Sequence, residues 1–289
     1  MTTRSEWLSA ARPRTLPAAS ASVFLGAGGA SYAGQADGRL TLLALGVALA
    51  IQIGVNYAND YSDGIRGTDE FRVGPARLTG SGRAAPAAVK RAAVSCFSLA
   101  AVFGLILVGV TNSWALAGIG ALAIVAAWFY TGGKNPYGYK GLADPVVFVF
   151  FGWFATLGTT WTQAHSLPWP VWFGASGSGL LSCALLMVNN LRDIPTDTQA
   201  GKHTLAVRLG DRWSRRLFSA YLAVALLLGL ACIAATTWAA LLLLLVPPAL
   251  LLTRNVFSGA QGHQLLPALT GTGLLTLGYG VLLGIALAI

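Results

Sequence analysis

Long apolar stretches, interrupted by short polar segments, dominate the pattern of the chain. Six stretches contain no Asp, Glu, Lys or Arg: 15–36, 40–59, 92–133, 145–191, 217–253 and 255–289. A helix needs about 20 residues to cross the hydrocarbon core of a bilayer. The first two stretches therefore fit one span each, and the next three fit two spans each with a turn between them. The last stretch begins with polar residues and fits one span. The pattern predicts nine transmembrane helices.

The composition agrees with this interpretation. The chain has 289 residues, of which 55% are hydrophobic and only 10% are charged, against about 25% charged residues in a typical soluble domain. Such a chain has too little polar surface to cover a soluble core, so soluble and disordered classes are excluded. The three cysteines are scattered in apolar runs and suggest neither a metal site nor a disulfide framework. We expect one membrane-embedded, all-α domain over residues 1–289.

Basic residues are distributed unevenly between the two sides that nine spans create. Among the 19 Lys and Arg residues, only Arg39 falls on the second side. Because cytoplasmic loops carry the excess of Lys and Arg, we expect a cytoplasmic N-terminus and a C-terminus outside. A basic surface favours contact with membrane lipid, whereas basic residues in such short loops do not predict nucleic-acid binding. The abundance of Arg, Ala and Gly suggests a high-GC bacterial genome. We therefore expect a multi-pass protein of a bacterial inner (plasma) membrane.

Acidic residues gather in two clusters on the predicted cytoplasmic side. The first cluster follows the second span and contains Asp60, Asp63, Asp69 and Glu70. Asn56 and Asn59 precede it, and at helical spacing both lie on the same face as Asp60 and Asp63. This face therefore carries two amides and two carboxylates at the predicted membrane boundary.

The second cluster follows the sixth span. Asp193 and Asp197 are four residues apart, and Asn189 and Asn190 precede them. The two acids share one face if the helix persists, although Pro195 could open a turn between them. Both clusters thus combine Asp with Asn at the end of a predicted span.

Clustered acids near a membrane boundary need a physical cause, because like charges at helical spacing destabilise a helix. Mg²⁺ prefers one or two carboxylates together with waters and phosphate oxygens. Two Asp sets on different helices would suit Mg²⁺ and a diphosphate held between them. The alternative is that these acids are solvated and balance nearby arginines.

Basic residues near the clusters could bind such a diphosphate. Lys134 and Lys140 flank a loop rich in Gly and Tyr, and Lys202 follows the second cluster. Arg14 lies just before the first span. Cations and the N–H groups of Gly-rich turns are suitable partners for phosphate oxygens. Each of these residues alone is also explained as an ordinary cytoplasmic Lys or Arg.

The two clusters resemble motifs of the UbiA-type intramembrane prenyltransferases. Asn59, Asp60 and Asp63 resemble the Asn-Asp-x-x-Asp motif of that family, and Asp193 and Asp197 its Asp-x-x-x-Asp motif. The segments most similar to the branch that prenylates 1,4-dihydroxy-2-naphthoate on the menaquinone pathway are 11–19, 56–82, 130–152 and 189–210. Many relatives carry a third acid where this chain has Gly67, and Asp69 is a less secure substitute.

The resemblance implies a fold and a reaction. The fold would be all-α, with nine transmembrane helices around a central cavity that opens to the cytoplasmic side. The reaction would transfer a polyprenyl chain from polyprenyl diphosphate to 1,4-dihydroxy-2-naphthoate, giving demethylmenaquinone, CO₂ and diphosphate. Mg²⁺ would be the cofactor, and the metal ligands would be Asp60, Asp63, Asp69, Asp193 and Asp197. The implied substrate-binding residues are Arg14, Asn56, Asn59, Lys134, Tyr137, Lys140, Asn190, Arg192 and Lys202.

Two questions stay open at this level. Asp144 or an acid of either cluster could take the phenolic proton of the acceptor, and all are candidate catalytic residues. The acceptor could also be another aromatic acid such as 4-hydroxybenzoate.

Other classes of protein are alternatives. An ion-coupled transporter also carries paired membrane acids, but usually near the bilayer midplane and within repeats. A purely structural membrane protein would leave the clusters without a purpose.

Overall fold

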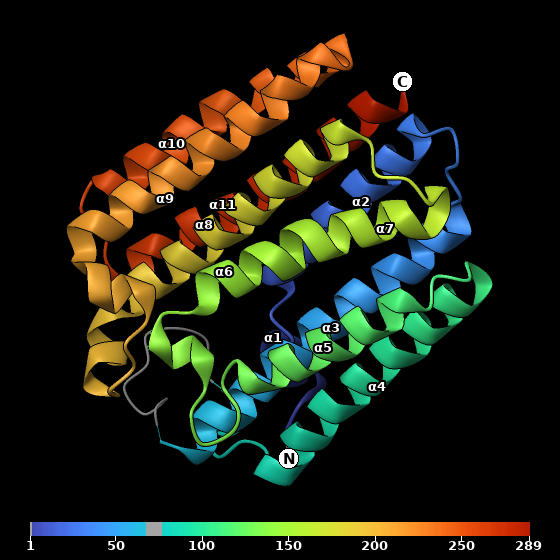
Figure 1. Ribbon diagram of the computed structural model, residues 1–289. Helices are drawn as coiled ribbons and strands as arrows, with labels where there is room; N and C mark the ends of the chain where they lie inside the picture. Colours follow the sequence, from blue (N-terminus) through green and yellow to red (C-terminus); the bar gives the residue numbers. More distant parts are fainter. Residues whose placement is uncertain (1, 68–76) are drawn as a thin grey trace.

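The computed structural model describes residues 2–67 and 77–289, and within these ranges all the regular secondary structure is helical (Figure 1). The longer α-helices are α2 (Leu16–Tyr32), α3 (Gly38–Ile65), α4 (Pro86–Val110), α5 (Ala115–Phe129), α7 (Ala155–Ala164), α8 (Trp169–Gln199), α9 (Leu205–Ala231), α10 (Val246–Phe257) and α11 (Leu266–Ala288). The short helices are α1 (Arg4–Ala10), α6 (Ala143–Val147), the 3-10 turns η1 (Pro13–Thr15), η2 (Tyr137–Lys140), η4 (Cys232–Ala234), η5 (Thr237–Leu245) and η6 (Gly262–Leu265), and the π-helix η3 (Phe148–Phe154).

Seven helical segments in the described ranges are long and apolar enough to cross a membrane. They are Gly38–Ile65, Pro86–Val110, Ala143–Ala164, Trp169–Gln199, Leu205–Ala234, Thr237–Phe257 and Gly262–Ala288. The all-α membrane architecture expected from the sequence is therefore confirmed. The other two predicted spans coincide with α2, which has 17 residues, and α5, which has 15. Both are shorter than the roughly 20 residues of a straight crossing.

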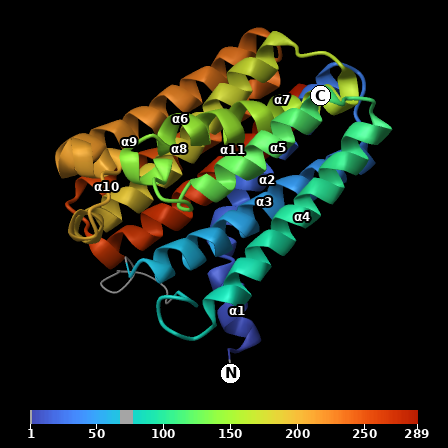
Figure 2. The ribbon, with the colours of Figure 1, turned by 60° about the horizontal axis from the view of Figure 1, so that its bottom comes forward.

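The helices lie side by side in one bundle, and α8 and α11 are at its centre (Figures 1 and 2). In the apolar window of α8, 72% of the residues are buried, against 28% for α3 and α4. Helix α8 packs on α9, α3 packs on α4, and α11 packs on α2. Because α8 is enclosed by neighbours, Asp193 near its end is buried.

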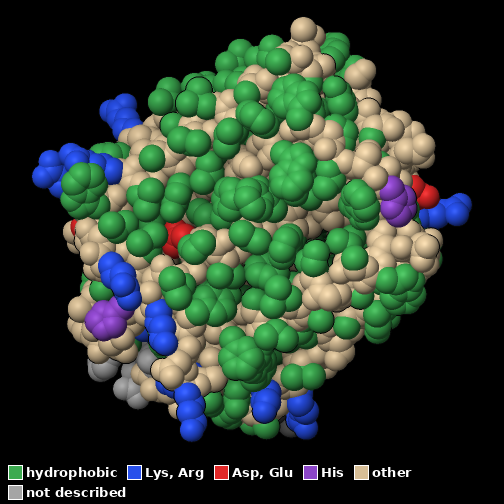
Figure 3. Space-filling view, viewed as in Figure 1, with side chains coloured by type: hydrophobic (Ala, Val, Ile, Leu, Met, Phe, Trp, Pro, Cys, Tyr) green, Lys and Arg blue, Asp and Glu red, His purple; other side chains and the backbone are tan. Residues whose placement is uncertain are grey.

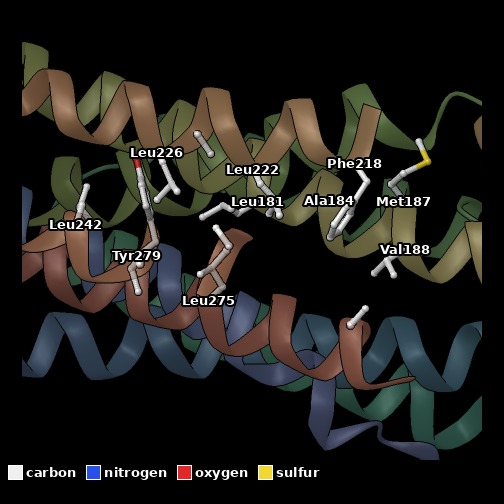
Figure 4. Packing of buried hydrophobic residues seen from close by; sticks show 14 of the residues in the cluster. Leu181, Ala184, Met187, Val188, Phe218, Leu222, Leu226, Leu242, Leu275 and Tyr279 are labelled. Carbon is white, nitrogen blue, oxygen red and sulfur yellow. The ribbon is translucent and has the colours of Figure 1, made fainter. Parts of the chain in front are cut away.

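The core between α8, α9, α11 and η5 fixes this central position. Leu181 and Met187 of α8 face Phe218 and Leu222 of α9, and all four are almost completely buried (Figure 4). Tyr279 of α11 approaches α8 at Gly177, where a Cβ atom would lie 2.0 Å from the tyrosine hydroxyl oxygen. A glycine is therefore needed for this close packing.

The surface of the bundle is apolar over its middle. Large exposed hydrophobic residues include Leu99, Val102, Leu105, Leu122, Leu243, Leu244, Leu250 and Leu251. In Figure 3 hydrophobic side chains cover most of the visible face, and Lys and Arg gather along its lower and left margins. An exposed apolar belt of this extent is typical of a lipid-facing surface. The two chain ends lie at opposite ends of the bundle (Figures 1 and 2).

Candidate active site

The ends of α3 and α8 lie beside the loop that contains η2 (Figure 1). Residues of these segments line a polar pocket. It has about 600 Å³ of empty space, part of it open to solvent. Its lining includes Asn59 and Asp63 from α3, Asn190, Asp193 and Asp197 from α8, and Arg12, Arg77, Tyr130, Tyr139 and Lys202 from other segments. The two acidic clusters, about 130 residues apart in the sequence, therefore contribute to one site.

Asp63 is the carboxylate on which several segments converge. It is 4% exposed, and its Oδ1 accepts a hydrogen bond from the Tyr139 hydroxyl and lies 3.3 Å from Lys202 Nζ. Its Oδ2 lies 3.3 Å from Arg77 Nη2. Lys202 Nζ also lies 4.6 Å from the centre of the Tyr139 ring. The charge of Asp63 is thus balanced by two cations from different loops.

Asp60 lies one turn earlier on α3 but has other partners. Its two carboxylate oxygens accept hydrogen bonds from the backbone N–H groups of Leu78 and Thr79, both at 2.8 Å. The side chain is almost completely buried, with 1% of Asp60 exposed. Asp60 is not part of the pocket lining. Two acids on one side of a helix therefore have different surroundings, since a three-residue step also rotates the side chain by about 60°.

The second cluster contains an ion pair within its own helix. Helix α8 continues through Pro195 to Gln199, so Asp193 and Asp197 do share a face. Arg192 donates from Nε and Nη2 to the two oxygens of Asp193, at 2.7 and 2.6 Å. Its Nη2 also donates to Asn189 Oδ1 at 3.0 Å. Such a bidentate pair is the strong form of a charge-assisted hydrogen bond.

The loop before η2 is fastened to α3. Arg66 donates to the carbonyl oxygens of Thr131 and Gly133, and the Thr131 hydroxyl donates to Asn59 Oδ1 at 2.7 Å. The backbone N–H of His203 donates to the carbonyl oxygen of Tyr139 at 2.8 Å, which joins this loop to the segment that carries Lys202. These contacts fix the position of the tyrosines and of Lys202 around Asp63.

Burial of the loop also affects its tyrosines. Tyr130 lines the pocket, and its ring meets that of Tyr137 edge-on, with 5.6 Å between the centres. Burial raises the pKa of Tyr130, and the neighbouring Tyr137 and the charges of Asp144, Asp63 and Asp197 raise it further. The Tyr130 hydroxyl is thus a neutral group that lies among three carboxylates.

Asp144 lies in α6, outside the pocket lining, and is 4% exposed. Its Oδ1 accepts a hydrogen bond from the Tyr221 hydroxyl at 3.1 Å. Its Oδ2 is buried and has no hydrogen-bond partner among the described residues. A buried acceptor without a partner is uncommon and needs an explanation.

Several predicted binding residues do not line the pocket. Arg14, Lys134 and Lys140 are exposed at the surface. Asn56 donates to the carbonyl oxygen of Ala11 at 2.8 Å and so joins α3 to the segment after α1. The Tyr137 hydroxyl donates to the carbonyl oxygen of Ala126 at 3.0 Å. Asp69, a predicted metal ligand, lies outside the described residues.

The donor set of the pocket fits Mg²⁺ only in part. Within residues 2–67 and 77–289, no group of three or more His, Cys, Asp and Glu is arranged to hold a metal ion alone. Asp63, Asp193 and Asp197, with the amides of Asn59 and Asn190, nevertheless offer oxygen atoms to one pocket. Mg²⁺ commonly uses one or two carboxylates and completes its shell with waters and phosphate oxygens. The residues therefore suit Mg²⁺ together with a phosphate ligand.

The sequence profile of the UbiA prenyltransferase family matches residues 16–265. The chain belongs to this family. It is 49% identical over 288 residues to a Mycobacterium tuberculosis protein named 1,4-dihydroxy-2-naphthoate octaprenyltransferase, covering 100% of this chain and 98% of the relative. An Escherichia coli protein of the same name is 42% identical over 234 residues, covering 79% of this chain and 75% of that relative. The family resemblance that the motifs indicated is confirmed.

Solved structures share the fold at low sequence identity. A UbiA homologue from Archaeoglobus fulgidus, bound to GPP and Mg²⁺, superposes with a TM-score of 0.72 at 13% identity, covering 98% of this chain and 99% of the other. A UbiA homologue from Aeropyrum pernix gives 0.71 at 15% identity, covering 93% and 96%. These similarities establish the UbiA fold for this chain.

Sequence reasoning missed several residues that line the pocket of this UbiA family member. Arg12 has a left-handed backbone, with φ of 53°, and reaches the pocket where Arg14 was expected. Arg77 follows Asp63 by 14 residues, and no helical spacing connects the two. Tyr139 was visible only as part of an aromatic loop. A basic residue before a helix or an aromatic residue in a loop gives no signal of the direction in which its side chain points.

Proposed function

We propose that this protein transfers a polyprenyl chain from polyprenyl diphosphate to 1,4-dihydroxy-2-naphthoate. In this reaction the C–O bond to the diphosphate breaks, and the ring carbon that carries the carboxylate bonds to the first prenyl carbon. The carboxylate leaves as CO₂, and its bonding electrons return to the ring. The products are a prenylated dihydroxynaphthalene, CO₂ and diphosphate, and oxidation to the quinone belongs to a later step. The convergence of both acidic clusters on one pocket is the observation that carries the proposal.

The charges of the pocket suit an exchange of partners when substrate binds. Without substrate, Asp63 is paired with Arg77 and Lys202, and Asp193 is paired with Arg192. Asp63, Asp193 and Asp197 are the groups that would hold Mg²⁺, which releases the basic side chains to bind phosphate oxygens. Bound Mg²⁺ would neutralise the negative charge that develops on the departing diphosphate.

The amides of Asn59 and Asn190 complete the oxygen donors of the pocket. The Thr131 hydroxyl holds Asn59 in place, so its side chain is oriented before substrate binds. Tyr130 and Tyr139 close the adjoining wall. These half-buried aromatic side chains would limit the access of water to the allylic carbon, whose cationic character would otherwise lead to hydrolysis. Lys134, Lys140 and Arg14 lie outside this arrangement, and we assign them no contact with the diphosphate.

Asp144, which lies outside the pocket lining, is our candidate proton acceptor for the aromatic substrate. Asp63 and Asp193 are both paired with cations and are assigned to Mg²⁺ in this proposal. Asp144 instead has one buried oxygen without a partner among the described residues, and Tyr221 holds the other. Asp144 would take the proton of a naphthoate hydroxyl as the ring attacks, and would return it when CO₂ leaves.

The same proposal includes the arrangement in the membrane. The chain would cross the inner (plasma) membrane nine times, with α2 and α5 as short crossings and the cavity open to the cytoplasmic side. An odd number of crossings accounts for chain ends at opposite ends of the bundle (Figure 2). The contact of the Thr2 hydroxyl with the carbonyl oxygen of Arg83 supports an N-terminus on the pocket side. The excess of Lys and Arg on that side supports a cytoplasmic orientation.

A prenyl-transfer assay on the purified protein in lipid tests the reaction. The assay supplies Mg²⁺, a polyprenyl diphosphate and either 1,4-dihydroxy-2-naphthoate or 4-hydroxybenzoate, with EDTA as the control. We expect prenylated product and CO₂ from the naphthoate alone, and none with EDTA. Product from the benzoate alone would overturn the acceptor. Folded protein that gives no product from either acceptor would overturn the proposed function.

A further inference from the structure

Asp60 contacts a turn next to the pocket and does not contact the pocket itself. Both of its carboxylate oxygens are engaged by backbone N–H groups, those of Leu78 and Thr79, at 2.8 Å each. The side chain is buried and is not part of the pocket lining. To bind a metal, Asp60 would have to abandon two buried N–H groups and rotate around α3. Buried donors without acceptors are strongly unfavourable, so this rearrangement is opposed.

The segment that Asp60 holds is the one that carries Arg77. Leu78 is 1% exposed and packs into the cluster around Tyr57 and Val89. Its carbonyl oxygen accepts a hydrogen bond from the N–H of Ala84, at 3.0 Å. The turn after Arg77 is therefore anchored by an apolar side chain, by a backbone hydrogen bond and by the Asp60 carboxylate.

Close packing of this turn against α3 adds a second constraint. A Cβ atom at Gly64 would lie 2.5 Å from Thr79 Cβ, so the turn can approach the helix only where residue 64 is glycine. Asp60 and Gly64 are four residues apart and share one side of α3. This side of the helix receives the turn and places the Arg77 guanidinium 3.3 Å from Asp63 Oδ2.

We propose that Asp60 is a positioning residue, which holds the turn after Arg77 so that Arg77 meets Asp63 and the diphosphate. This inference rests on the proposed function, since it names the role of Arg77 in that site. It also departs from the sequence motif, which groups Asp60 with the metal ligands. The motif groups Asp60 with Asp63. Their contacts differ, because Asp60 binds the backbone of a turn and Asp63 lines the pocket.

Two measurements separate a positioning residue from a metal ligand. The first is the affinity for Mn²⁺ in the presence of an inert prenyl thiolodiphosphate, followed by electron paramagnetic resonance. The second is the KM for polyprenyl diphosphate, measured apart from kcat. The variants are Asp60→Asn, Arg77→Ala, the double variant Asp60→Asn/Arg77→Ala, and Asp63→Asn as the metal-ligand control.

We expect Asp60→Asn to raise KM about tenfold, because Asn keeps only one acceptor oxygen for the two N–H groups. Its Mn²⁺ affinity should stay within about twofold of wild type, whereas Asp63→Asn should weaken Mn²⁺ binding about tenfold or more. The double variant should be no worse than Arg77→Ala, because both changes remove the same contact. Equal loss of Mn²⁺ affinity in Asp60→Asn and Asp63→Asn would overturn the proposal, as would additive effects on KM.

Gly64→Ala provides a second variant that leaves the carboxylate intact. The added methyl group displaces Thr79 and the turn, so it should reproduce the rise in KM with unchanged Mn²⁺ affinity. An unchanged KM in Gly64→Ala would count against the inference even if Asp60→Asn does not fold. The Mn²⁺ titration needs no turnover, so it can be measured even if the proposed function is wrong. Wild-type protein that binds Mn²⁺ with the thiolodiphosphate but transfers no prenyl group would refute the proposed function. The Mn²⁺ affinities of the variants could still be compared in that case.

Discussion

The two acidic clusters are alike in sequence but are built differently. Asp63, in the first cluster, contacts Tyr139, Arg77 and Lys202, which come from three other segments. Asp193, in the second, is paired with Arg192, its neighbour on the same helix. The first cluster is therefore assembled by contacts between segments, whereas the second contains an ion pair within α8.

This difference assigns separate tasks to the two helix ends. A carboxylate that contacts several loops also holds those loops in place. Its loss should therefore disturb both substrate binding and the position of the loops. Loss of a carboxylate that is paired within its own helix should disturb the loops less. The comparison also shows why a motif acid such as Asp60 is not automatically a ligand, since its oxygens are taken by the backbone N–H groups of Leu78 and Thr79.

The largest effect should come from Asp63→Asn. This variant removes a negative charge that serves the metal and also releases Tyr139, Arg77 and Lys202. We expect kcat/KM to fall about 10³-fold or more, and we expect faster hydrogen exchange in residues 130–140. A variant with near wild-type prenyl transfer would show that the first cluster does not hold the metal.

Asp193→Asn should have the next largest effect. We expect a loss of about 10²-fold in kcat/KM, with hydrogen exchange of residues 130–140 changed less than in Asp63→Asn, because Arg192, which pairs with Asp193, lies on α8. Loosening of that loop in Asp193→Asn, to the extent seen with Asp63→Asn, would erase the distinction between the clusters. Far-UV circular dichroism in the same detergent serves as the control for folding.

Lys202→Met should have a smaller effect, confined to binding. Lys202 balances Asp63 and would move to a phosphate oxygen, so its loss should raise the KM for polyprenyl diphosphate about tenfold with little change in kcat. Steady-state kinetics with the naphthoate at saturation measure this separation. A fall in kcat at constant KM would mean that Lys202 acts in the chemical step instead.

The smallest effect should come from Lys134→Ala and Lys140→Ala. Both side chains are exposed and outside the pocket, so kcat/KM should change by no more than about twofold. The same kinetic assay checks this. A loss comparable to that of Lys202→Met in either variant would extend the diphosphate site to the surface of the η2 loop.

Much of the architecture was predictable because hydrophobic periodicity and charge asymmetry are strong signals in a membrane protein. The helices fall where the apolar stretches predicted them. The sequence placed Asp193 and Asp197 on one face only if the helix persists through Pro195, and α8 does continue to Gln199.

The rest depended on tertiary contacts that spacing does not encode. Arg12 reaches the pocket through a left-handed residue, and Arg77 reaches Asp63 through a turn held by another acid. The lysines of the η2 loop were expected in the site because they are basic and close in sequence, yet they are exposed. Local composition indicates which charges are available, and only the folded chain determines which of them meet.

The most direct test of the account is a structure of the protein with Mg²⁺ and a prenyl thiolodiphosphate. We predict that the diphosphate lies between the ends of α3 and α8, with Asp63 and at least one of Asp193 and Asp197 on Mg²⁺. Arg77 and Lys202 should contact phosphate oxygens, and Asp60 should remain on the amides of Leu78 and Thr79. A diphosphate bound elsewhere, or held by one cluster without the other, would contradict the claim that the two clusters form a single site.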